Sequence, residues 1–184
     1  MTKTTSCMLP LGTPAALFSL TDSITGNVIT LEQSKGTIAT VICFICNHCP
    51  YVKHISTELA RTAIDYQNSG ISFLAINAND AQQYPEDSVE NMQKTANKLQ
   101  YSFPYLFDET QEVAKAYQAT CTPDFFIFDD QLKLVYRGQF DSSRPGNNIK
   151  VTGNSIRHTL DCLINHQEIL TEQRPSLGCN IKWK

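Results

Sequence analysis

Residues 37–52, with the sequence TIATVICFICNHCPYV, contain the stretch that decides the fold. Residues 37–45 form an apolar run rich in β-branched side chains, which predicts a strand buried on both faces. Residues 50–68 then carry apolar side chains at helical spacing and stop before Gly70, which predicts a helix. Residues 71–76 supply a second buried strand. A strand, a helix and a strand within about forty residues predict a βαβ unit with a parallel strand pair and a right-handed crossover.

Elements on either side of this unit extend it to an α/β domain with the order βαβ and then ββα, in which helices flank a central mixed sheet. We expect an N-terminal β-hairpin, a helical insertion after the second buried strand, a second hairpin and a last helix. The expected elements are strands at 17–20 and 28–31, helices at 85–99 and 109–117, strands at 125–128 and 132–136, and a helix at 155–165. The domain spans residues 17–166 and follows an extension at 1–16. The tail at 167–184 is expected to dock on the domain, because it carries the apolar residues Ile181 and Trp183.

Composition narrows the range of functions. The chain has 184 residues, a formal net charge of −3 and no basic stripe, which argues against a nucleic-acid partner. No apolar run is long enough to span a bilayer, and the first residues do not resemble a signal peptide. We therefore expect a cytoplasmic protein with no membrane partner. The chain has seven cysteines, and an odd number leaves one thiol over in any closed set of disulfides.

The motif Cys46-Asn47-His48-Cys49 lies where the first buried strand meets the helix. Free backbone N–H groups at a helix N-terminus stabilise a thiolate, and the two-residue spacing lets both sulfurs form and break a disulfide. We assign nucleophilic attack to Cys46 at the loop edge and resolution to Cys49, one turn into the helix. A protonated His48 would stabilise the thiolate and make the disulfide a stronger oxidant.

Two other interpretations of this motif stay open. Zinc and iron–sulfur sites also use a two-residue cysteine spacing, but they need further ligands, and the remaining cysteines are isolated in the sequence. In a reducing compartment, close cysteine pairs are redox or metal motifs more often than structural bridges. We expect no metal and no other cofactor. The remaining alternative is a non-catalytic binding module that keeps the fold as a scaffold.

Five segments of the chain resemble one known family. They are FICNHCPYV at 44–52, YPEDSVENM at 84–92, CTPDFFIFD at 121–129, YRGQFD at 136–141 and GCNIKWK at 178–184. From about residue 17 to the end, the chain resembles a peroxiredoxin-like branch of the thioredoxin superfamily, of the alkyl-hydroperoxide-reductase/thiol-specific-antioxidant (AhpC/TSA) type. The resemblance implies a thioredoxin-like fold and a redox-active CxxC pair, and it leaves the substrate open.

The resemblance also implies a cis-proline that faces the cysteine pair, and Thr122-Pro123 matches that position. A cis bond is costly except before proline, which explains the residue type. Exposed backbone beside such a proline can pair with an extended peptide from a partner. The expected site therefore consists of Cys46, His48, Cys49 and Pro123 for catalysis, with Asn47, Thr122 and Pro123 as substrate contacts.

The signature of peroxidase chemistry, Pro-x-x-x-Thr-x-x-Cys, is incomplete. Counting back from Cys49 places Cys46 at the threonine position and Ile42 at the proline position. Counting back from Cys46 gives Cys43 and Ala39. The hydroxyl that would orient a peroxide is missing, so we expect a thiol–disulfide oxidoreductase, with a thiol peroxidase that reduces hydroperoxides as the alternative. Its partners would be a protein disulfide, a small thiol or disulfide, or a peroxide, and an external thiol reductant would reset the pair.

Cys121 and Cys179 are candidate auxiliary redox thiols. Cys121 precedes the expected cis-proline by two residues, and Cys179 lies in the tail. If the tail folds back, Cys179 approaches Cys121 or the active pair, where it would act as a third redox thiol or form a bridge. A packed thiol is the alternative for Cys179. The other three cysteines need no redox role; they are Cys7, Cys43 and Cys162.

Overall fold

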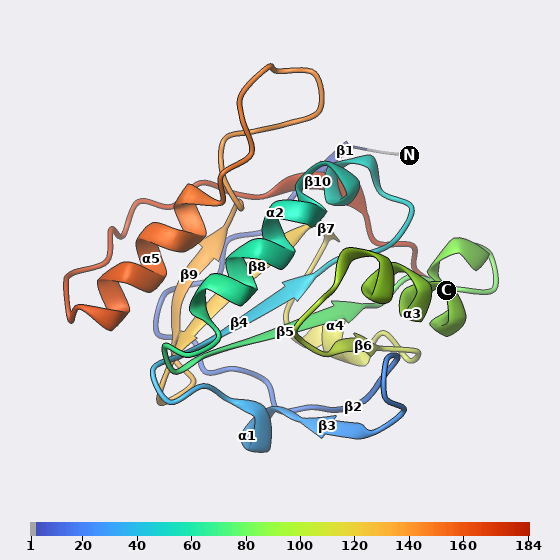
Figure 1. Cartoon of the computed structure of the whole chain (residues 1–184), viewed down its shortest axis with the longest axis horizontal. Helices are drawn as coiled ribbons and strands as arrows, with labels where there is room; N and C mark the ends of the chain where they lie inside the picture. Colours follow the sequence, from blue (N-terminus) through green and yellow to red (C-terminus); the bar gives the residue numbers. More distant parts are fainter. Residues whose placement is uncertain (1–2) are drawn as a thin grey trace.

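The computed structural model describes residues 3–184 and shows an α/β fold built around a central mixed sheet (Figure 1). The strands are β1 (Lys3–Thr5), β2 (Ser19–Asp22), β3 (Val28–Thr30), β4 (Ala39–Phe44), β5 (Ile71–Asn77), β6 (Tyr105–Phe107), β7 (Cys121–Thr122), β8 (Asp124–Asp129), β9 (Leu134–Gly138) and β10 (Leu177–Asn180). The helices are α1 (Leu31–Ser34), α2 (Pro50–Tyr66), α3 (Val89–Leu99), α4 (Glu112–Ala116) and α5 (Asn154–Ile164), with a short 3-10 helix η1 (Pro85–Asp87) before α3. Within this described range, no helix has the length and apolar character needed to cross a membrane.

Strand β4 lies inside the main sheet, whose order is β3-β2-β6-β5-β4-β8-β9. Every residue of β4 is buried, as an uninterrupted apolar run requires when both faces of a sheet are covered. It pairs parallel to β5 and antiparallel to β8, and helix α2 connects β4 to β5. The predicted βαβ unit is therefore confirmed, and so are the first hairpin, formed by β2 and β3, and the second, formed by β8 and β9.

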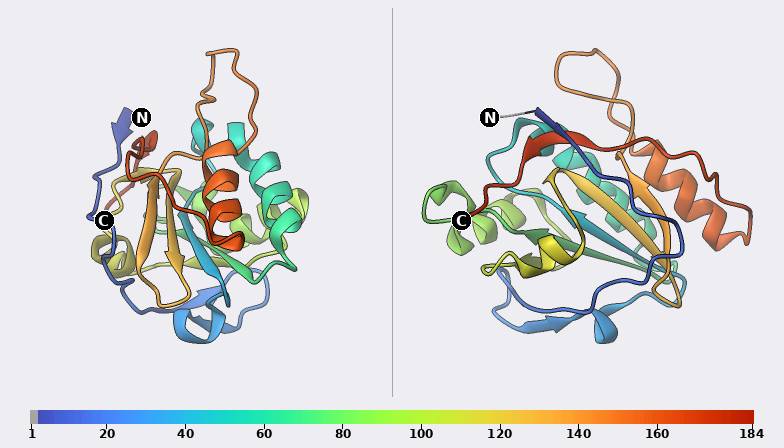
Figure 2. Two further views of the ribbon diagram at one scale, coloured as in Figure 1. Left: turned by 90° about the vertical axis from the view of Figure 1, so that its left-hand side faces the viewer. Right: turned by 180° about the vertical axis from the view of Figure 1, so that it is seen from behind.

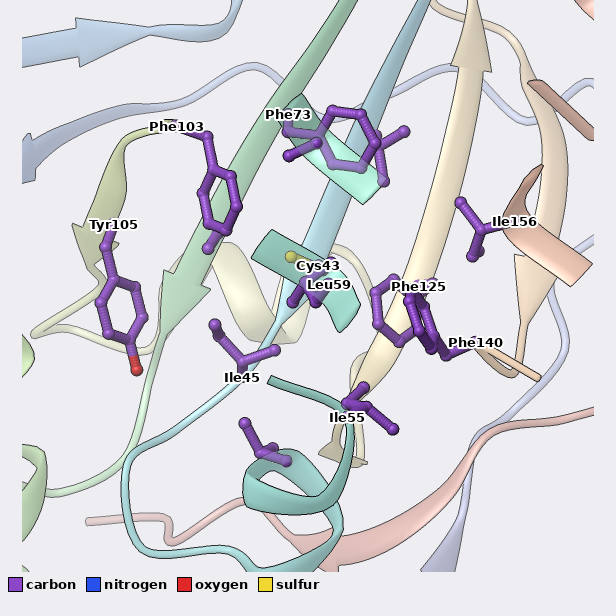
Figure 3. Close-up of a cluster of buried hydrophobic side chains, with 14 of the residues drawn as sticks. Cys43, Ile45, Ile55, Leu59, Phe73, Phe103, Tyr105, Phe125, Phe140 and Ile156 are labelled. Atoms are coloured by element: carbon purple, nitrogen blue, oxygen red, sulfur yellow. The ribbon is translucent and has the colours of Figure 1, made fainter. Parts of the chain in front are cut away.

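Helices cover both faces of the main sheet. On one face, Cys43 of β4, Leu59 of α2 and Ile156 of α5 belong to one buried cluster (Figure 3). On the other face, a second buried cluster includes Tyr117 at the end of α4, Phe44 and Phe126. The ring centroid of Tyr117 lies 5.7 Å from that of Phe44 and 5.5 Å from that of Phe126. The two clusters hold β4 rigidly, and so they fix the position of the loop that follows it.

A second, smaller sheet joins the two ends of the chain. Its order is β1-β10-β7, with both pairs antiparallel. Figure 2 shows the N-terminal segment in blue and the C-terminal segment in red running side by side. Ile181 is buried in the second cluster, whereas Trp183 keeps 40% of its surface exposed. The tail thus lies against the body through β10 and Ile181, and β10 ends next to the cis-proline segment.

Several local predictions need correction. The helix expected at 85–99 is broken at Ser88, whose backbone is extended and whose hydroxyl accepts from the N–H of Asn91 to cap α3. The helix expected at 109–117 is confined to α4, and β9 starts later than expected because Leu132 takes a left-handed turn conformation at φ 58°. Strands β1, β6, β7 and β10 were not predicted, because each has only two to four residues and pairs with a segment far away in the sequence.

Candidate active site

The CxxC motif occupies the junction between β4 and α2. Cys49 was expected one turn into the helix, but it is the N-cap residue of α2, because Pro50 takes the first helical position, where a missing backbone N–H costs nothing. Cys46 and Cys49 are both buried, with exposures of 2% and 0%. In the first turn of α2, the backbone N–H of Val52 donates to the Cys49 sulfur, which is the environment that stabilises a thiolate.

Cys49 has the larger number of hydrogen-bond donors around its sulfur. Its Sγ atom lies 2.9 Å from Sγ of Cys179, and in the thiol form Cys49 donates to the carbonyl oxygen of Thr122 at 3.2 Å. Donation from the Cys46 thiol, and then from the Cys179 thiol and the backbone N–H groups of Val52 and Cys179, favours a thiolate at this position. These donors outweigh the opposing effect of burial and lower the pKa of Cys49 to about 5.

The surroundings of Cys46 favour the protonated thiol over the thiolate. Its Sγ atom lies 3.2 Å from Oγ1 of Thr122. Burial, the hydrogen bond to Cys49 and the negative charge of Asp87 together raise the pKa of Cys46 well above its ordinary value. The two directions together favour a thiolate at Cys49 over one at Cys46. The assignment of attack to Cys46 and of resolution to Cys49 stays a prediction; these pKa shifts oppose it, because Asp87 and Cys179 approach the pair from distant segments.

His48 and Asp87 form a buried polar pair beside Cys46. Nδ1 of His48 lies 2.6 Å from Oδ2 of Asp87, and the imidazole stacks on the ring of Tyr84 with centroids 5.3 Å apart. Nε2 of His48 is buried and has no hydrogen-bond partner among residues 3–184. Asp87 is the site residue that the sequence interpretation missed. The signal was present in the segment YPEDSVENM, but its acids were interpreted only as the start of a helix.

Asn47 is fixed by three hydrogen bonds. Its backbone N–H donates to Oδ1 of Asp87 at 2.7 Å, its side-chain amide donates to the carbonyl oxygen of Glu86 at 2.8 Å, and its Oδ1 accepts from the hydroxyl of Tyr105 at 3.2 Å. Asn47 also forms part of the wall of an open hollow of about 320 Å³. The other residues that line this hollow are Glu86, Asn91, Lys94, Thr95 and Lys98. Asn47 thus connects the cysteine loop with an open hollow.

The peptide bond between Thr122 and Pro123 is cis, and it lies against the cysteine pair through the two contacts of Thr122 given above. We expected exposed backbone at this position, open to a partner peptide, and that expectation is wrong. Strand β10 pairs with β7 here, with Cys179 opposite Thr122. A Cβ atom on Gly178 would lie only 1.9 Å from the carbonyl oxygen of Thr122, so the close approach of these two strands requires glycine. The edge beside the cis-proline is already occupied by the chain itself.

The two candidate auxiliary thiols have different surroundings. Cys179 contacts Cys49 directly, as described above, and burial, followed by the hydrogen bond to Cys49 and the charge of Cys49, raises its pKa to about 12 in the reduced protein. Cys121 is buried, with its thiol 3.8 Å from the carbonyl oxygen of Pro123, and burial together with the charge of Asp124 raises its pKa. Of the other cysteines, Cys43 and Cys162 are buried and Cys7 is exposed.

One group of side chains near the pair has the residue types of a metal site. The ligating atoms of Cys46, His48 and Asp87 all lie within 4.8 Å of one another. Two ligands at 2.0–2.3 Å from a tetrahedral zinc ion are separated by about 3.2–3.8 Å. Nδ1 of His48 and Oδ2 of Asp87 are only 2.6 Å apart and are bonded to each other. The group as arranged fits a hydrogen-bonded network better than a metal centre.

Comparison with family models matches residues 11–137 to the AhpC/TSA family. This chain belongs to the AhpC/TSA family. The matched region contains the CxxC motif, Asp87 and the cis-proline, and it ends before β10. Cys179 therefore lies in a part of this AhpC/TSA chain that the family model does not include. No curated protein matches the chain.

Several solved structures are similar to this chain over most of its length. An uncharacterised conserved protein from Geobacillus kaustophilus is 61% identical, with a TM-score of 0.98, over 100% of this chain and 97% of the other. A hypothetical protein from Sinorhizobium meliloti 1021 is 47% identical, with a TM-score of 0.96, over 98% of each chain. A putative thiol:disulfide interchange protein DsbE from Chlorobium tepidum is 16% identical, with a TM-score of 0.68, over 85% of this chain and 99% of the other. At that identity the likeness shows the thioredoxin-like fold alone.

Proposed function

We propose that this AhpC/TSA protein is a thiol–disulfide oxidoreductase that cycles Cys46 and Cys49 between a dithiol and a disulfide. The observation that carries the proposal is the position of the pair: the motif lies at the N-terminus of α2, and both sulfurs contact Thr122 of the cis Thr122-Pro123 bond. The pKa of Cys49 is lowered to about 5, whereas that of Cys46 is raised well above its ordinary value. A thiolate next to a protonated thiol is the arrangement that thiol–disulfide exchange needs, because one sulfur attacks and the other then resolves.

In the proposed cycle the Cys49 thiolate attacks one sulfur of a substrate disulfide, and the other substrate sulfur leaves as a thiolate. Cys46 then attacks the Cys49 sulfur of the mixed disulfide, which releases the second substrate thiol and leaves a Cys46–Cys49 disulfide. Cys46 must give up its proton in this step, and we assign its acceptance to the adjacent His48–Asp87 pair. Thr122 holds the Cys46 sulfur through its hydroxyl. An external thiol reductant in the cytoplasm would reset the pair.

The surroundings of the pair favour a small substrate. Strand β10 covers the edge beside Pro123, so a partner peptide cannot add there as a strand while the tail is in place. The hollow beside Asn47 has a volume of about 320 Å³, and two lysines, Lys94 and Lys98, line it. We propose that a small disulfide with negatively charged groups approaches from this side, with Asn47 at its contact point and Pro123 closing the opposite side of the pair.

A thiol peroxidase is the second candidate. One observation favours it: the thiolate belongs to Cys49, which is also the helix N-cap, and the backbone N–H of Val52 stabilises it there. A peroxide would oxidise this thiolate to a sulfenic acid, which would condense with a neighbouring thiol and release water. The Pro-x-x-x-Thr-x-x-Cys signature is absent, so we expect this reaction to be the slower of the two.

The two candidates are separated by offering the reduced protein different oxidants. We expect oxidised glutathione to produce the Cys46–Cys49 disulfide faster than an equal concentration of hydrogen peroxide, and faster than reduced insulin chains appear from insulin. The variant Cys49→Ser should lose the reaction, whereas Cys121→Ser, which replaces another fully buried cysteine, should retain it. Rapid peroxide consumption without exchange against either disulfide would favour the peroxidase, and inertness towards all three would contradict both candidates.

A further inference from the structure

Strand β10 holds Cys179 against the active pair. It lies between β1 and β7, so its backbone is bonded on both sides, and Cys179 is opposite both Lys3 and Thr122 in the two pairings. The preceding residue, Gly178, gives the close approach to Thr122. Cys179 is only 3% exposed. A thiol held this firmly beside a reactive cysteine differs from an incidental cysteine in a loose tail.

The three sulfurs form a chain with Cys49 in the middle. On one side Sγ of Cys49 lies 2.9 Å from Sγ of Cys179, and on the other side it is hydrogen-bonded to the Cys46 thiol. A covalent S–S bond is about 2.05 Å long, so the Cys49–Cys179 pair is in non-bonded contact and needs a small approach to bridge. Exchange requires the attacking sulfur to contact the sulfur that already belongs to a disulfide, and Cys179 satisfies this at Cys49.

We propose that Cys179 is a third redox thiol, and that an oxidised protein shifts its disulfide from Cys46–Cys49 to Cys49–Cys179. This inference rests on the proposed function, which supplies the Cys46–Cys49 disulfide. In the shift the deprotonated sulfur of Cys179 attacks Sγ of Cys49, the bond between Cys49 and Cys46 breaks, and Cys46 leaves with the electron pair. The proton lost by Cys179 ends on Cys46, so the shift consumes no external oxidant or reductant.

The shift has two consequences for the site. A Cys49–Cys179 disulfide would link the N-terminus of α2 covalently to β10, and it would lock the C-terminal strand over the segment that contains Pro123. Cys46 would return to the thiol form at the end of the loop that faces Asp87. The oxidised protein would then exist in two forms. In one, Cys46 and Cys49 form the disulfide and Cys179 is a thiol; in the other, Cys49 and Cys179 form the disulfide and Cys46 is a thiol.

The test maps disulfides in the full-length protein after brief oxidation with diamide. Samples are quenched in acid, free thiols are alkylated, and a non-reducing digest is analysed by tandem mass spectrometry. We expect both disulfides in the wild type, with Cys49–Cys179 increasing over time. Cys46→Ser should contain Cys49–Cys179 as its main disulfide, Cys179→Ser should contain only Cys46–Cys49, and Cys121→Ser should behave as the wild type.

The outcomes separate this inference from the proposed function. If Cys46–Cys49 forms in the wild type and Cys179 is alkylated at every time, the third-thiol proposal is wrong while the proposed function stands. A Cys46→Ser protein that keeps the wild-type circular dichroism spectrum and never bridges Cys49 to Cys179 leads to the same conclusion. If Cys179→Ser forms no disulfide while Cys46→Ser bridges, Cys46 and Cys49 do not form a disulfide, and both the proposed function and the shift are wrong. No disulfide in any protein contradicts both.

Discussion

Cys43, Cys49 and Cys121 are equally buried, with 0% exposure each. The pKa of Cys49 is nevertheless shifted in the direction opposite to the pKa values of Cys43 and Cys121. Burial raises the pKa of Cys43 and of Cys121. At Cys49 the same desolvation is overcome by hydrogen bonds, and the pKa is lowered to about 5. The difference teaches that depth alone does not make a cysteine inert. The number of hydrogen-bond donors around the sulfur determines whether the thiol or the thiolate is favoured, and in this fold the donors surround the cysteine at the N-terminus of α2.

The largest effect should follow from removing the central thiol. In a Cys7→Ser background, which eliminates the exposed cysteine, Cys49→Ser should slow reaction with a chromogenic aromatic disulfide by about a hundredfold or more at pH 7, since even an ordinary thiol is only a few per cent thiolate there. The rate is followed by absorbance. A Cys49→Ser protein that reacts as fast as its parent would place the reactive thiolate elsewhere.

A smaller effect is expected when β10 is pushed away without removing a thiol. In Gly178→Ala the new Cβ would meet the carbonyl oxygen of Thr122, so β10 must shift and Cys179 moves with it. We expect the pKa of Cys49 to rise, by about one unit, and the free energy of unfolding to fall by about 1–3 kcal/mol. The pH dependence of alkylation and denaturant unfolding measure the two quantities.

The control for this variant is Gly146→Ala. It places alanine at a left-handed position, φ +86°, where a Cβ meets nothing within 4 Å. This variant should lose some stability through backbone strain and leave the pKa of Cys49 unchanged. Equal pKa changes in both variants would show that Cys179 has no influence on Cys49.

The next effect concerns the negative charge beside Cys46. Asp87→Asn removes a buried carboxylate that adds to the effect of burial in raising the pKa of Cys46, so that pKa should fall. Glu86→Gln removes the same charge from the neighbouring residue, which is exposed, and should change little because solvent screens it. Alkylation of Cys46 as a function of pH, in Cys49→Ser backgrounds, measures both. Identical profiles for the two variants would remove Asp87 from the site.

The smallest effect is expected at Cys121, a buried cysteine whose pKa is raised. Cys121→Ser should leave the rate of disulfide exchange within about twofold of the parent, because burial keeps this thiol protonated throughout the working range of pH. The assay is the one used for Cys49→Ser. A large loss of exchange in a folded Cys121→Ser protein would mean that Cys121 takes part in electron transfer.

Local patterns in the sequence were enough to predict the core of the fold. The apolar run of β4, the helical spacing of α2 and the CxxC motif between them are all contained in adjacent residues, and their physical causes are local as well. The position of the thiol pair at a helix N-terminus follows directly from this order. The same reasoning correctly identified the parallel pairing of β4 with β5.

The distribution of charge within the site could not be predicted in this way. It depends on Asp87, which follows β5, and on Cys179 at the end of the chain, and both contacts bridge long stretches of sequence. Strand β10 has four residues and no apolar periodicity, so its pairing with β1 and β7 has no local signal. The roles of Cys46 and Cys49 were therefore assigned from helix position alone, whereas the long-range contacts raise the pKa of Cys46 and lower that of Cys49.

The pH dependence of Cys49 alkylation tests the central claim most directly. Reduced full-length Cys7→Ser protein is treated with iodoacetamide between pH 4 and pH 10, and modification at Cys49 is quantified by mass spectrometry. A thiol whose pKa is lowered to about 5 is a thiolate above that pH, so the rate should be constant from about pH 6 upward and fall tenfold per pH unit below 5. A rate that instead continues to rise tenfold per unit up to pH 8 or 9 would show an ordinary thiol at Cys49 and would contradict the account.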